Sequence, residues 1–424
     1  MSKSELSTEP YKGVRDFYPS DWAKLSAVFT KTRAVLYARG FEEYQASPLE
    51  HSELYESKGN EEIIREQTFS FEDRGGRRVT LRPEMTPTLA RMVAAKRREL
   101  VFPLRWFSIG NRFRYERPQR GRLREFFQTD VDLIGLPEGE ADVEIVSLAS
   151  EILRSFGASE KDFVIKVNSR KLLNLACKVS GLTEGEASKA YWQLVDKKAK
   201  MPVAEFEQER KKFSADPLAV IESDSNEEVS AEKKKLLSQI EELRKRGVSN
   251  VVFDTDTVRG FEYYTGIVFE LFDTNPENPR ALFGGGRYDG LVSLFGGEPI
   301  PAVGFAIGDV TLMDFLDTHN LFKNAGGLHA PQVYIGTPSE KDVPTGGQFA
   351  KTLRDAGIRT FVNLTGKSLG DQVKEADKRG IPLFIAYGGN EAASGLVKIK
   401  TLATGIEKEV AVTKAASLIT SLFS

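Results

Sequence analysis

The sequence contains very few of the residues that form disulfides and metal sites. Its 424 residues include one cysteine and three histidines. Cys177 has no cysteine partner within the chain, and a single thiol cannot build a thiolate metal site. His51, His319 and His329 lie far apart and show no metal-binding spacing. We therefore predict no internal disulfide and no protein-bound metal, and a reducing cytoplasm is the simplest location.

Long apolar runs are missing as well. No stretch of about 18 apolar residues is present that could form a transmembrane helix, and MSKSELSTEP at the start lacks the apolar segment of a secretion signal. We expect no membrane partner and no leader peptide. Hydrophobic residues (40%) and charged residues (28%) occur in the proportions of a soluble globular protein, whose length allows two or three domains.

An excess of one charge sign is also lacking, because Lys and Arg number 59 against 61 for Asp and Glu. This balance does not favour a non-specific nucleic-acid binder. Residues 105–124 are the exception, with seven arginines and a single acid, Glu116. A charged run often forms only a solvated surface. The use of arginine without lysine favours binding of phosphate or carboxylate, which the planar guanidinium fork suits.

Two common nucleotide-binding motifs are absent. GKS at 366–368 lacks the first glycine of a P-loop, because Phe361 occupies that place. No GxGxxG segment follows a predicted strand, which argues against a Rossmann dinucleotide site. Neither type of phosphate-binding loop is therefore expected.

The chain is predicted to form two domains. The first spans 1–325 and is interrupted at 170–246 by a Lys- and Glu-rich segment with heptad-like apolar positions, which predicts a mostly helical insertion. NAGGLHAP (324–331) reads as a linker. In 331–424, strand-like and helix-like segments alternate, which predicts a small α/β domain with a parallel or mixed sheet. Helices are expected at 20–40, 86–98, 139–156, 344–356 and 368–379, and strands of the second domain at 333–336, 359–364 and 381–388.

The segment 105–134 reads as an antiparallel hairpin with one polar and one apolar face. Arg112, Arg114 and Glu116 share one face of its first strand by period-two alternation. Gln128, Asp130 and Asp132 share one face of the second strand, and Phe127, Thr129, Val131 and Leu133 share the other. The polar face could simply face solvent. Its guanidinium, amide and carboxylate groups also suit an anionic nucleotide and a zwitterionic amino acid.

Polar segments flank this hairpin in the sequence. Upstream, LRPEMT contains Glu84 and Thr86. Downstream, VRGFEYYTGIVFE is predicted to be a strand carrying Arg259, Glu262, Tyr263 and Tyr264, and FGGGRYDG follows at 283–290. Three successive glycines are most simply a tight turn, but they also allow a ligand to approach the backbone closely.

These segments resemble a known enzyme family. RYERPQRGRLREFFQTDVDLIG (114–135) is similar to the motif 2 hairpin of class II aminoacyl-tRNA synthetases, and VRGFEYYTGIVFE with GGGRYDGLVSLFGG resembles the signature of the histidine-specific members. GVRDFYP…GFEEYQASPLE (13–50) resembles their motif 1, which forms much of the dimer interface. The tail 331–424, with QVKEADKRGIP, resembles their anticodon-binding domain. The likeness covers nearly the whole chain, least clearly 170–246.

The resemblance implies a fold and an activity. The fold would be an α+β catalytic domain with an antiparallel sheet flanked by helices, a helical insertion, and a C-terminal α/β anticodon-binding domain. The activity would be ATP-dependent conversion of L-histidine to histidyl-adenylate, followed by transfer to tRNA(His), in a cytoplasmic homodimer. Mg²⁺ would accompany ATP, but the motifs nominate no residue as its ligand.

The resemblance also assigns site residues by motif position. For histidine, Glu84, Thr86 and Gln128 would receive the α-ammonium group, Asp132 and Tyr264 would hold the imidazole, and Tyr263 and Tyr288 would wall the pocket. For ATP, Arg114 would bind the α-phosphate and also the histidine carboxylate, Glu116 would meet adenine, Arg122 would reach the outer phosphates, and Phe126 would stack on adenine. Arg259 would lie over the carboxylate and the α-phosphate, so Arg114 and Arg259 are the expected catalytic residues.

One position departs from the family pattern. In AVGFAIGDVTLM (302–313), Thr311 occupies the place of the motif 3 arginine that contacts the γ-phosphate of ATP. Loss of a charged donor to phosphate costs about 1.5–3 kcal/mol if nothing compensates. A subset of the family is similar here, with a GD pair after the strand, so we interpret Thr311 as subtype variation.

Two other functions remain as alternatives. A regulatory paralogue, such as the accessory subunit of ATP phosphoribosyltransferase, would keep the fold but usually lacks the C-terminal domain and the ATP-binding arginines. Arg114, Arg122, Arg259 and the tail are all present here. A purely RNA-binding protein would not need the pattern of Glu84, Gln128, Asp132 and Tyr264. Histidine-dependent ATP–pyrophosphate exchange distinguishes the three possibilities.

Overall fold

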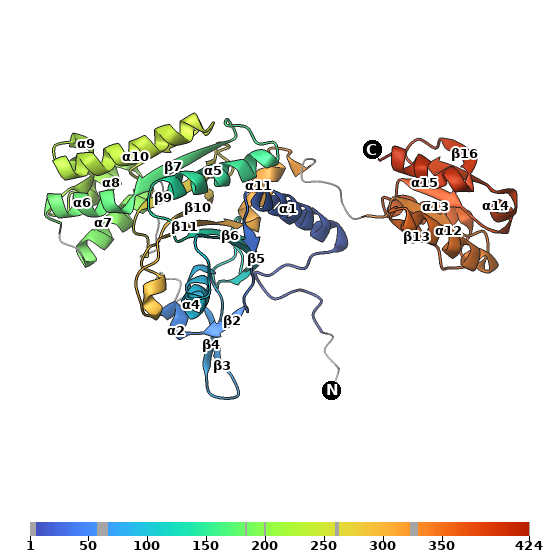
Figure 1. Ribbon diagram of the computed structural model, residues 1–424, viewed down its shortest axis with the longest axis horizontal. Helices are drawn as coiled ribbons and strands as arrows, with labels where there is room; N and C mark the ends of the chain where they lie inside the picture. Colours follow the sequence, from blue (N-terminus) through green and yellow to red (C-terminus); the bar gives the residue numbers. More distant parts are fainter. Residues whose placement is uncertain are drawn as a thin grey trace. The chain divides into compact units, whose positions relative to one another are not determined.

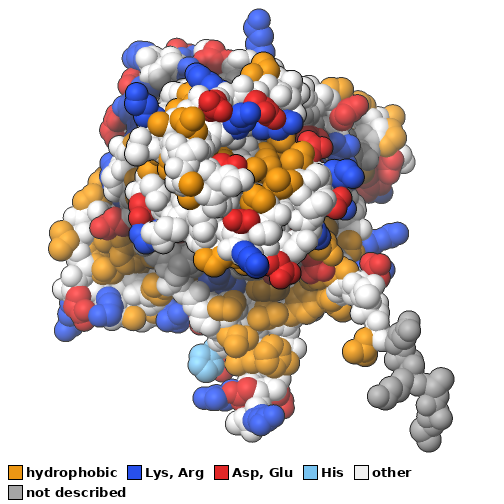
Figure 2. All heavy atoms as spheres, turned by 90° about the vertical axis from the view of Figure 1, so that its right-hand side faces the viewer, with side chains coloured by type: hydrophobic (Ala, Val, Ile, Leu, Met, Phe, Trp, Pro, Cys, Tyr) orange, Lys and Arg blue, Asp and Glu red, His pale blue; other side chains and the backbone are white. Residues whose placement is uncertain are grey.

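The computed structural model describes residues 6–56, 67–182, 185–198, 201–258, 263–322 and 330–423. The chain forms two compact units, Met1–Gly326 and Gly327–Ser424 (Figure 1). Within the described ranges, no helix combines the length and apolarity needed to cross a membrane. Basic and acidic side chains are interspersed on the face shown in Figure 2, as the balanced composition leads one to expect.

The first unit is built on an eight-stranded sheet in the order β1-β5-β6-β11-β10-β9-β7-β8. Its inner strands pair antiparallel, whereas β1 with β5 and β7 with β8 pair parallel at the two edges. This is the antiparallel α+β architecture expected from the sequence. The strands are β1 (Glu42–Glu43), β5 (Leu104–Phe113), β6 (Glu125–Ile134), β7 (Phe163–Ser169), β8 (Val251–Phe253), β9 (Ile267–Asp273), β10 (Ala281–Arg287) and β11 (Ala302–Gly308).

One face of this sheet forms the main hydrophobic core. Phe107 and Val131 project from the hairpin β5–β6 into this core and are fully buried. Side chains from three helices pack against them, because each helix presents an apolar stripe to the sheet. The helices are α1 (Pro19–Ala38), α5 (Glu140–Ser155) and α11 (Asp309–Thr318). The polar face of the hairpin is therefore left for the opposite side of the sheet.

That opposite side is covered by a smaller cluster of elements. The helix α4 (Thr86–Lys96) packs there with the 3₁₀ turn η2 (Val292–Phe295). Leu89 and Val93 of α4 share a buried cluster with Tyr263, Tyr264 and Tyr288. A small antiparallel sheet, β2 (Leu49–His51), β4 (Arg78–Leu81) and β3 (Phe69–Glu72), and the short helix α2 (Glu53–Glu56) complete this side.

Between β7 and β8, the described residues form five α-helices with a core of their own. Leu173, Tyr191 and Phe206 are buried in this core. Polar caps begin three of the helices, since the side chains of Ser169, Asp216 and Asn226 accept backbone N–H groups that lack helical partners. The helices are α6 (Arg170–Ser180), α7 (Glu186–Lys197), α8 (Val203–Arg210), α9 (Pro217–Ser223) and α10 (Glu227–Lys245).

The second unit contains a five-stranded mixed sheet in the order β13-β12-β14-β15-β16. The first three strands are parallel and their connections contain helices, as the alternating sequence pattern predicts. The antiparallel strands β15 and β16 have no counterpart in the sequence prediction, because lysines and glutamates on their exposed face weaken the apolar signal. The elements are β12 (Val333–Gly336), η4 (Glu340–Asp342), α12 (Val343–Asp355), β13 (Thr360–Val362), α13 (Leu369–Lys378), β14 (Leu383–Ala386), α14 (Gly389–Ser394), β15 (Leu396–Thr401), β16 (Glu407–Ala411) and α15 (Val412–Ser421).

Candidate active site

A cavity of about 120 Å³ lies on the polar face of β6, β10 and β11. Its lining includes every described residue that the sequence assigned to histidine: Glu84, Thr86, Arg114, Gln128, Asp132, Tyr263, Tyr264 and Tyr288. Arg259, the remaining residue of that set, lies outside the described residues, as does Glu262. The cavity therefore brings together residues from distant parts of the chain, from Glu84 to Tyr288, which are 204 positions apart.

Small residues on β11 leave room for this cavity. Gly304 pairs with Asp132 and Ala306 pairs with Asp130 across the two strands. A Cβ atom on Gly304 would lie 2.3 Å from Oδ1 of Asp132, which is far inside contact distance. Glycine is therefore required at 304, because the same Cβ atom would also lie 2.6 Å from the backbone oxygen of Val131, which cannot turn away as a side chain can.

The Asp132 carboxyl group is held away from solvent. Its side chain is almost fully buried, and burial raises its pKa to about 8. The hydroxyl group of Tyr288 donates a hydrogen bond to Oδ1 and opposes this rise in pKa, whereas the charge of Asp130 adds to it. A buried carboxyl group of this kind gains most from a partner that donates a hydrogen bond or carries positive charge.

Asp130 was placed on the polar face by its spacing but was not nominated from the sequence. It also lines the cavity. The guanidinium group of Arg112, which is fully buried, donates to Oδ2 of Asp130 at 2.5 Å. Burial raises the Asp130 pKa and Arg112 opposes the shift. The hairpin's polar face is thus buried around the paired Arg112 and Asp130, and the alternative of a solvent-facing surface is wrong.

A second group of acceptors lies near the start of α4. The hydroxyl group of Tyr263 donates to Oε2 of Glu84 at 3.0 Å. Burial raises the Glu84 pKa to about 7, and the charge of Arg114 partly opposes this shift. The side-chain oxygen of Gln128 is buried without a hydrogen-bond partner among the described residues. These oxygens offer acceptors to a cationic group in the cavity.

Tyr263 and Tyr264 do not lie on a strand, contrary to the sequence prediction. The strand β9 begins only at Ile267. Both tyrosines line the same cavity, with their ring centroids 5.0 Å apart. Consecutive residues of a strand would point to opposite faces of the sheet. An irregular backbone is what allows two adjacent aromatic side chains to line one wall.

The three successive glycines lie within β10 and do not form a turn, so that interpretation is wrong. A Cβ atom on Gly285 would lie 2.0 Å from the carbonyl oxygen of Gly304 on the neighbouring strand. One on Gly286 would lie 2.7 Å from Cδ1 of Tyr264. Gly284 lines the cavity. The glycines therefore permit close approach, both between β10 and β11 and between β10 and the tyrosine wall.

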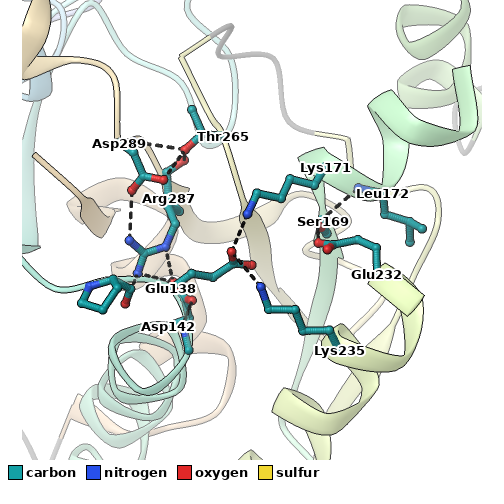
Figure 3. A network of polar contacts seen from close by, with 12 residues as sticks. Glu138, Asp142, Ser169, Lys171, Leu172, Glu232, Lys235, Thr265, Arg287 and Asp289 are labelled. Carbon is teal, nitrogen blue, oxygen red and sulfur yellow. Dashed lines mark hydrogen bonds and ion pairs between the residues drawn. The ribbon is translucent and has the colours of Figure 1, made fainter. Parts of the chain in front are cut away.

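A buried ion-pair network holds the segment that carries Tyr288 (Figure 3). Arg287 is fully buried and donates to Oδ1 of Asp142 on α5 at 2.8 Å and to Oδ1 of Asp289 at 3.0 Å. Its remaining hydrogen bonds go to the backbone oxygens of Leu136 and Pro137. Because two carboxylates and two carbonyls fix one guanidinium group, the position of Tyr288 is set by α5 and by the loop before it.

The same network reaches the helices between β7 and β8. Lys171 of α6 and Lys235 of α10 both point to Glu138, at 2.5 Å and 2.9 Å from Oε2 (Figure 3). The two ammonium groups lower the Glu138 pKa despite its partial burial. Glu138 lies four residues before Asp142, so one short segment contacts both the helical region and Arg287.

A groove of about 280 Å³ continues from the cavity and shares Arg114, Gln128, Gly284 and Ala306 with it. The residues assigned to ATP from the sequence, Arg114, Glu116, Arg122 and Phe126, all line this groove. The Arg114 guanidinium carbon lies 5.3 Å from the centroid of the Phe126 ring, and Nε donates to the backbone oxygen of Pro83 at 3.0 Å. Arg114 therefore stands where the cavity and the groove meet.

Glu270 also lines the groove, although the sequence did not nominate it. It belongs to β9, opposite Gly284 of β10. The sequence feature that could have pointed to Glu270 is its place as a polar residue among the apolar residues of the strand segment VFELFD. That signal cannot reveal which face of the sheet holds the site.

Glu84→Gln is expected to make stability less dependent on pH. Between about pH 4.3, where a free glutamate titrates, and pH 7, the native Glu84 retains a proton that the unfolded chain has released. Stability therefore falls as pH rises, by up to about 1.4 kcal/mol per pH unit for this group. Denaturant midpoints at pH 5 and pH 7.5 should converge in the variant, while the exposed control Glu53→Gln should match wild type. If stability changed with pH equally in Glu84→Gln and Glu53→Gln, the effect of burial on Glu84 would be contradicted.

Two family models match the chain. The model described as histidyl-tRNA synthetase matches residues 13–311. The model described as an anticodon-binding domain matches residues 332–422. The two matches together cover both compact units.

Individual relatives match over nearly the full length. A histidine–tRNA ligase of Leptospira biflexa is 40% identical over 422 residues, covering 95% of each chain. One of Opitutus terrae is 38% identical, covering 97% of this chain and 98% of that protein. Among solved structures, a histidyl-tRNA synthetase from Nostoc sp. PCC 7120 aligns with a TM-score of 0.79 at 26% identity, covering 99% of this chain and 100% of that chain.

Proposed function

The chain belongs to the histidyl-tRNA synthetase family, and on that premise we propose how the cavity and the groove divide the substrates of the reaction. The protein activates histidine with ATP and charges tRNA with the product. The family fixes this activity, but it leaves open which side chains of this chain bind each substrate. The observation that carries our proposal is the continuity of the two spaces at Arg114.

We propose that the cavity binds histidine. Its α-ammonium group is placed among Glu84, Thr86 and Gln128, because these side chains supply oxygen acceptors near the start of α4. Its imidazole is placed between Asp132 and Tyr264, with Tyr263 and Tyr288 as walls. The buried carboxyl group of Asp132 supports this orientation, because an imidazole N–H is a suitable partner for it.

We propose that the groove binds ATP. Phe126 stacks on adenine, Glu116 accepts from its amino group, and Arg122 binds the outer phosphates. ATP arrives as its Mg²⁺ complex, and the lining of the groove includes the carboxylate group of Glu270, a ligand type that Mg²⁺ prefers. This arrangement leaves Arg114 beside the α-phosphate, at the entrance to the cavity.

The chemistry then needs no covalent enzyme intermediate. A carboxylate oxygen of histidine attacks the α-phosphorus of ATP, the bond to the β-phosphate oxygen breaks, and pyrophosphate leaves. A terminal ribose hydroxyl of tRNA next attacks the carbonyl carbon of the adenylate, and AMP leaves. Arg114 touches both reacting groups, so it aligns them and stabilises charge at phosphorus. We assign Arg259 a similar catalytic role from its motif position alone.

The regulatory alternative is not better supported than the enzyme. A protein of Bacillus halodurans described as an ATP phosphoribosyltransferase regulatory subunit/histidyl-tRNA synthetase shares the fold with a TM-score of 0.72, but it is only 22% identical. Arg114 and Arg122 line the groove here, and residues 332–422 match an anticodon-binding domain. These features are the ones that a regulatory paralogue usually lacks.

Histidine-dependent ATP–pyrophosphate exchange tests the assignment of the two sites. We expect exchange to depend on histidine, and subsequent transfer of labelled histidine to tRNA(His) but not to other tRNAs. We place this reaction in the cytoplasm, where these substrates meet. Exchange that proceeds equally with other amino acids would refute the assignment of the cavity to histidine.

We also propose a homodimer formed through residues 13–50, which resemble the motif 1 interface. Large aromatic side chains of this segment are exposed in the single chain, including Tyr18, Trp22 and Tyr37. Exposed apolar surface of this kind is typical of an interface. Light scattering at micromolar concentration should give twice the chain mass. A monomer under these conditions would contradict the proposal.

A further inference from the structure

The groove is lined by a threonine at the position where the motif 3 arginine of the family would supply a cation. Thr311, on α11, lines the groove, and its hydroxyl group donates to the backbone oxygen of Leu282 at 2.6 Å. This side chain carries no charge and its proton is already engaged. The terminal phosphates of ATP carry several negative charges, so a second cation besides Arg122 is needed to stabilise them there.

A second cavity of about 240 Å³ adjoins this part of the groove. The two spaces share Gly121, Leu282 and Thr311 as lining residues. Two arginines that do not line the groove itself, Arg120 and Arg280, line this second cavity. Positive charge is therefore available immediately beyond Thr311.

Three parts of the chain meet at this point. Gly121 is at the tip of the loop between β5 and β6, Thr311 is in the first turn of α11, and Arg280 immediately precedes β10. A Cβ atom on Gly121 would lie 3.5 Å from Cδ of Arg280 and 3.7 Å from Cγ2 of Thr311. The side chain of Arg280 thus runs beside Thr311, within reach of the space that a longer side chain at 311 would enter.

The nearby arginines differ in their existing partners. Arg122 forms an ion pair with Glu116 at 3.2 Å. Arg120 donates to Oδ1 of Asn278 at 3.1 Å, and its charge opposes the rise in the pKa of Asp314 that burial causes. Arg280 is exposed, and no hydrogen bond or ion pair joins it to any other residue within the described ranges. Of these three guanidinium groups, the one of Arg280 can turn toward a ligand without breaking a contact.

We propose that Arg280 binds the terminal phosphates of ATP and supplies the charge that Thr311 cannot. The inference rests on the nucleotide site proposed above. A guanidinium group suits this role because its planar donors can bind two phosphate oxygens at once. Arg280 lies just before β10, whereas residue 311 is on α11, so the cation reaches the phosphates from a different part of the chain.

The variant Arg280→Ala tests this role through substrate-specific kinetics. In ATP–pyrophosphate exchange, we expect KM for ATP and KM for pyrophosphate to rise roughly 10- to 100-fold, as for the loss of one charged hydrogen-bonding partner. KM for histidine and inhibition by AMP should stay close to wild type, because neither involves the terminal phosphates. The exposed Arg98→Ala is the control and should match wild type in all four measurements.

A second variant tests whether Arg280 replaces a cation at position 311. Adding Thr311→Arg to Arg280→Ala should recover most of the lost affinity for ATP and pyrophosphate. A double variant no better than Arg280→Ala would overturn the replacement. An unchanged KM for ATP in Arg280→Ala would overturn the role of Arg280. An equal rise in the KM for ATP and in the inhibition constant for AMP would also overturn it, because AMP lacks the terminal phosphates.

These outcomes are distinct from failure of the proposed site itself. Absence of histidine-dependent exchange in the wild-type protein would refute the nucleotide site, and this inference with it. Normal wild-type exchange with an unaffected Arg280→Ala variant would refute only the role of Arg280. Replacing Arg120 in the same assay should affect KM for ATP less than replacing Arg280, because Arg120 is held by Asn278, and the reverse order would also overturn the assignment.

Discussion

Replacing Arg114 with alanine is expected to lower kcat/KM for histidine-dependent ATP–pyrophosphate exchange by about 10³- to 10⁴-fold. Arg114 lines both the cavity and the groove, and its guanidinium group lies over Phe126. It therefore contacts both partners of the reaction in our proposal. Charge develops at the α-phosphorus in the transition state, so the loss should appear in kcat as well as in KM.

Two further variants show whether this effect is specific. Arg114→Lys keeps the charge but loses the planar fork and the bond from Nε to the backbone oxygen of Pro83, so we expect only partial recovery. Arg98→Ala removes an exposed arginine that lines neither space, and it should retain full activity. If Arg114→Ala lost less than tenfold in kcat/KM while remaining folded, the central position of Arg114 in the mechanism would be refuted.

Replacing Asp132 with asparagine should lower kcat/KM for histidine by about 10²- to 10³-fold, with KM for ATP little changed. Asparagine has nearly the same size as aspartate, so the cavity should keep its shape. The change removes the negative charge that the ionised Asp132 presents to the imidazole. It also leaves the hydroxyl group of Tyr288 without its carboxylate partner. The variant should affect histidine more than ATP, because Asp132 lines the cavity and not the groove.

The same variant should alter the pH profile. Burial raises the Asp132 pKa to about 8, so much of the carboxyl group is protonated at pH 7. If the ionised form accepts a hydrogen bond from the imidazole N–H, kcat/KM for histidine in the wild type should rise as pH increases toward 8. Asp132→Asn should lose this rise, whereas Asp377→Asn, an exposed change in the second unit, should keep it. A wild-type profile identical to that of Asp132→Asn would contradict the role of Asp132.

Local patterns were sufficient for part of the site. Side chains two residues apart in a strand share a face, so spacing alone grouped Gln128, Asp130 and Asp132. Composition likewise distinguished 170–246 from the rest of the first domain, because a solvent-exposed helical region is rich in Lys and Glu, whereas the strands around it are rich in glycine. These features depend on neighbouring residues along the chain, which is why they could be predicted without a fold.

Other predictions failed because they depended on distant contacts. The glycines at 284–286 were most simply a turn, but their requirement comes from β11 and the tyrosine wall. Tyr263 and Tyr264 were placed on a strand, although the cavity requires both to face one side. Similarly, nothing local distinguished the buried polar face of the hairpin from a solvated one, since its cover is provided by α4 and Tyr263.

The amino-acid sequence by itself determined the family, the order of helices and strands in outline, and most residue types of the site, because short motifs carry that information. Only the tertiary structure decided that these residues enclose one cavity joined to one groove, that burial shifts the pKa values of Glu84 and Asp132, and that Arg280 lies beside Thr311. Burial and proximity arise when strands from distant parts of the chain pair, and no local pattern reports that pairing.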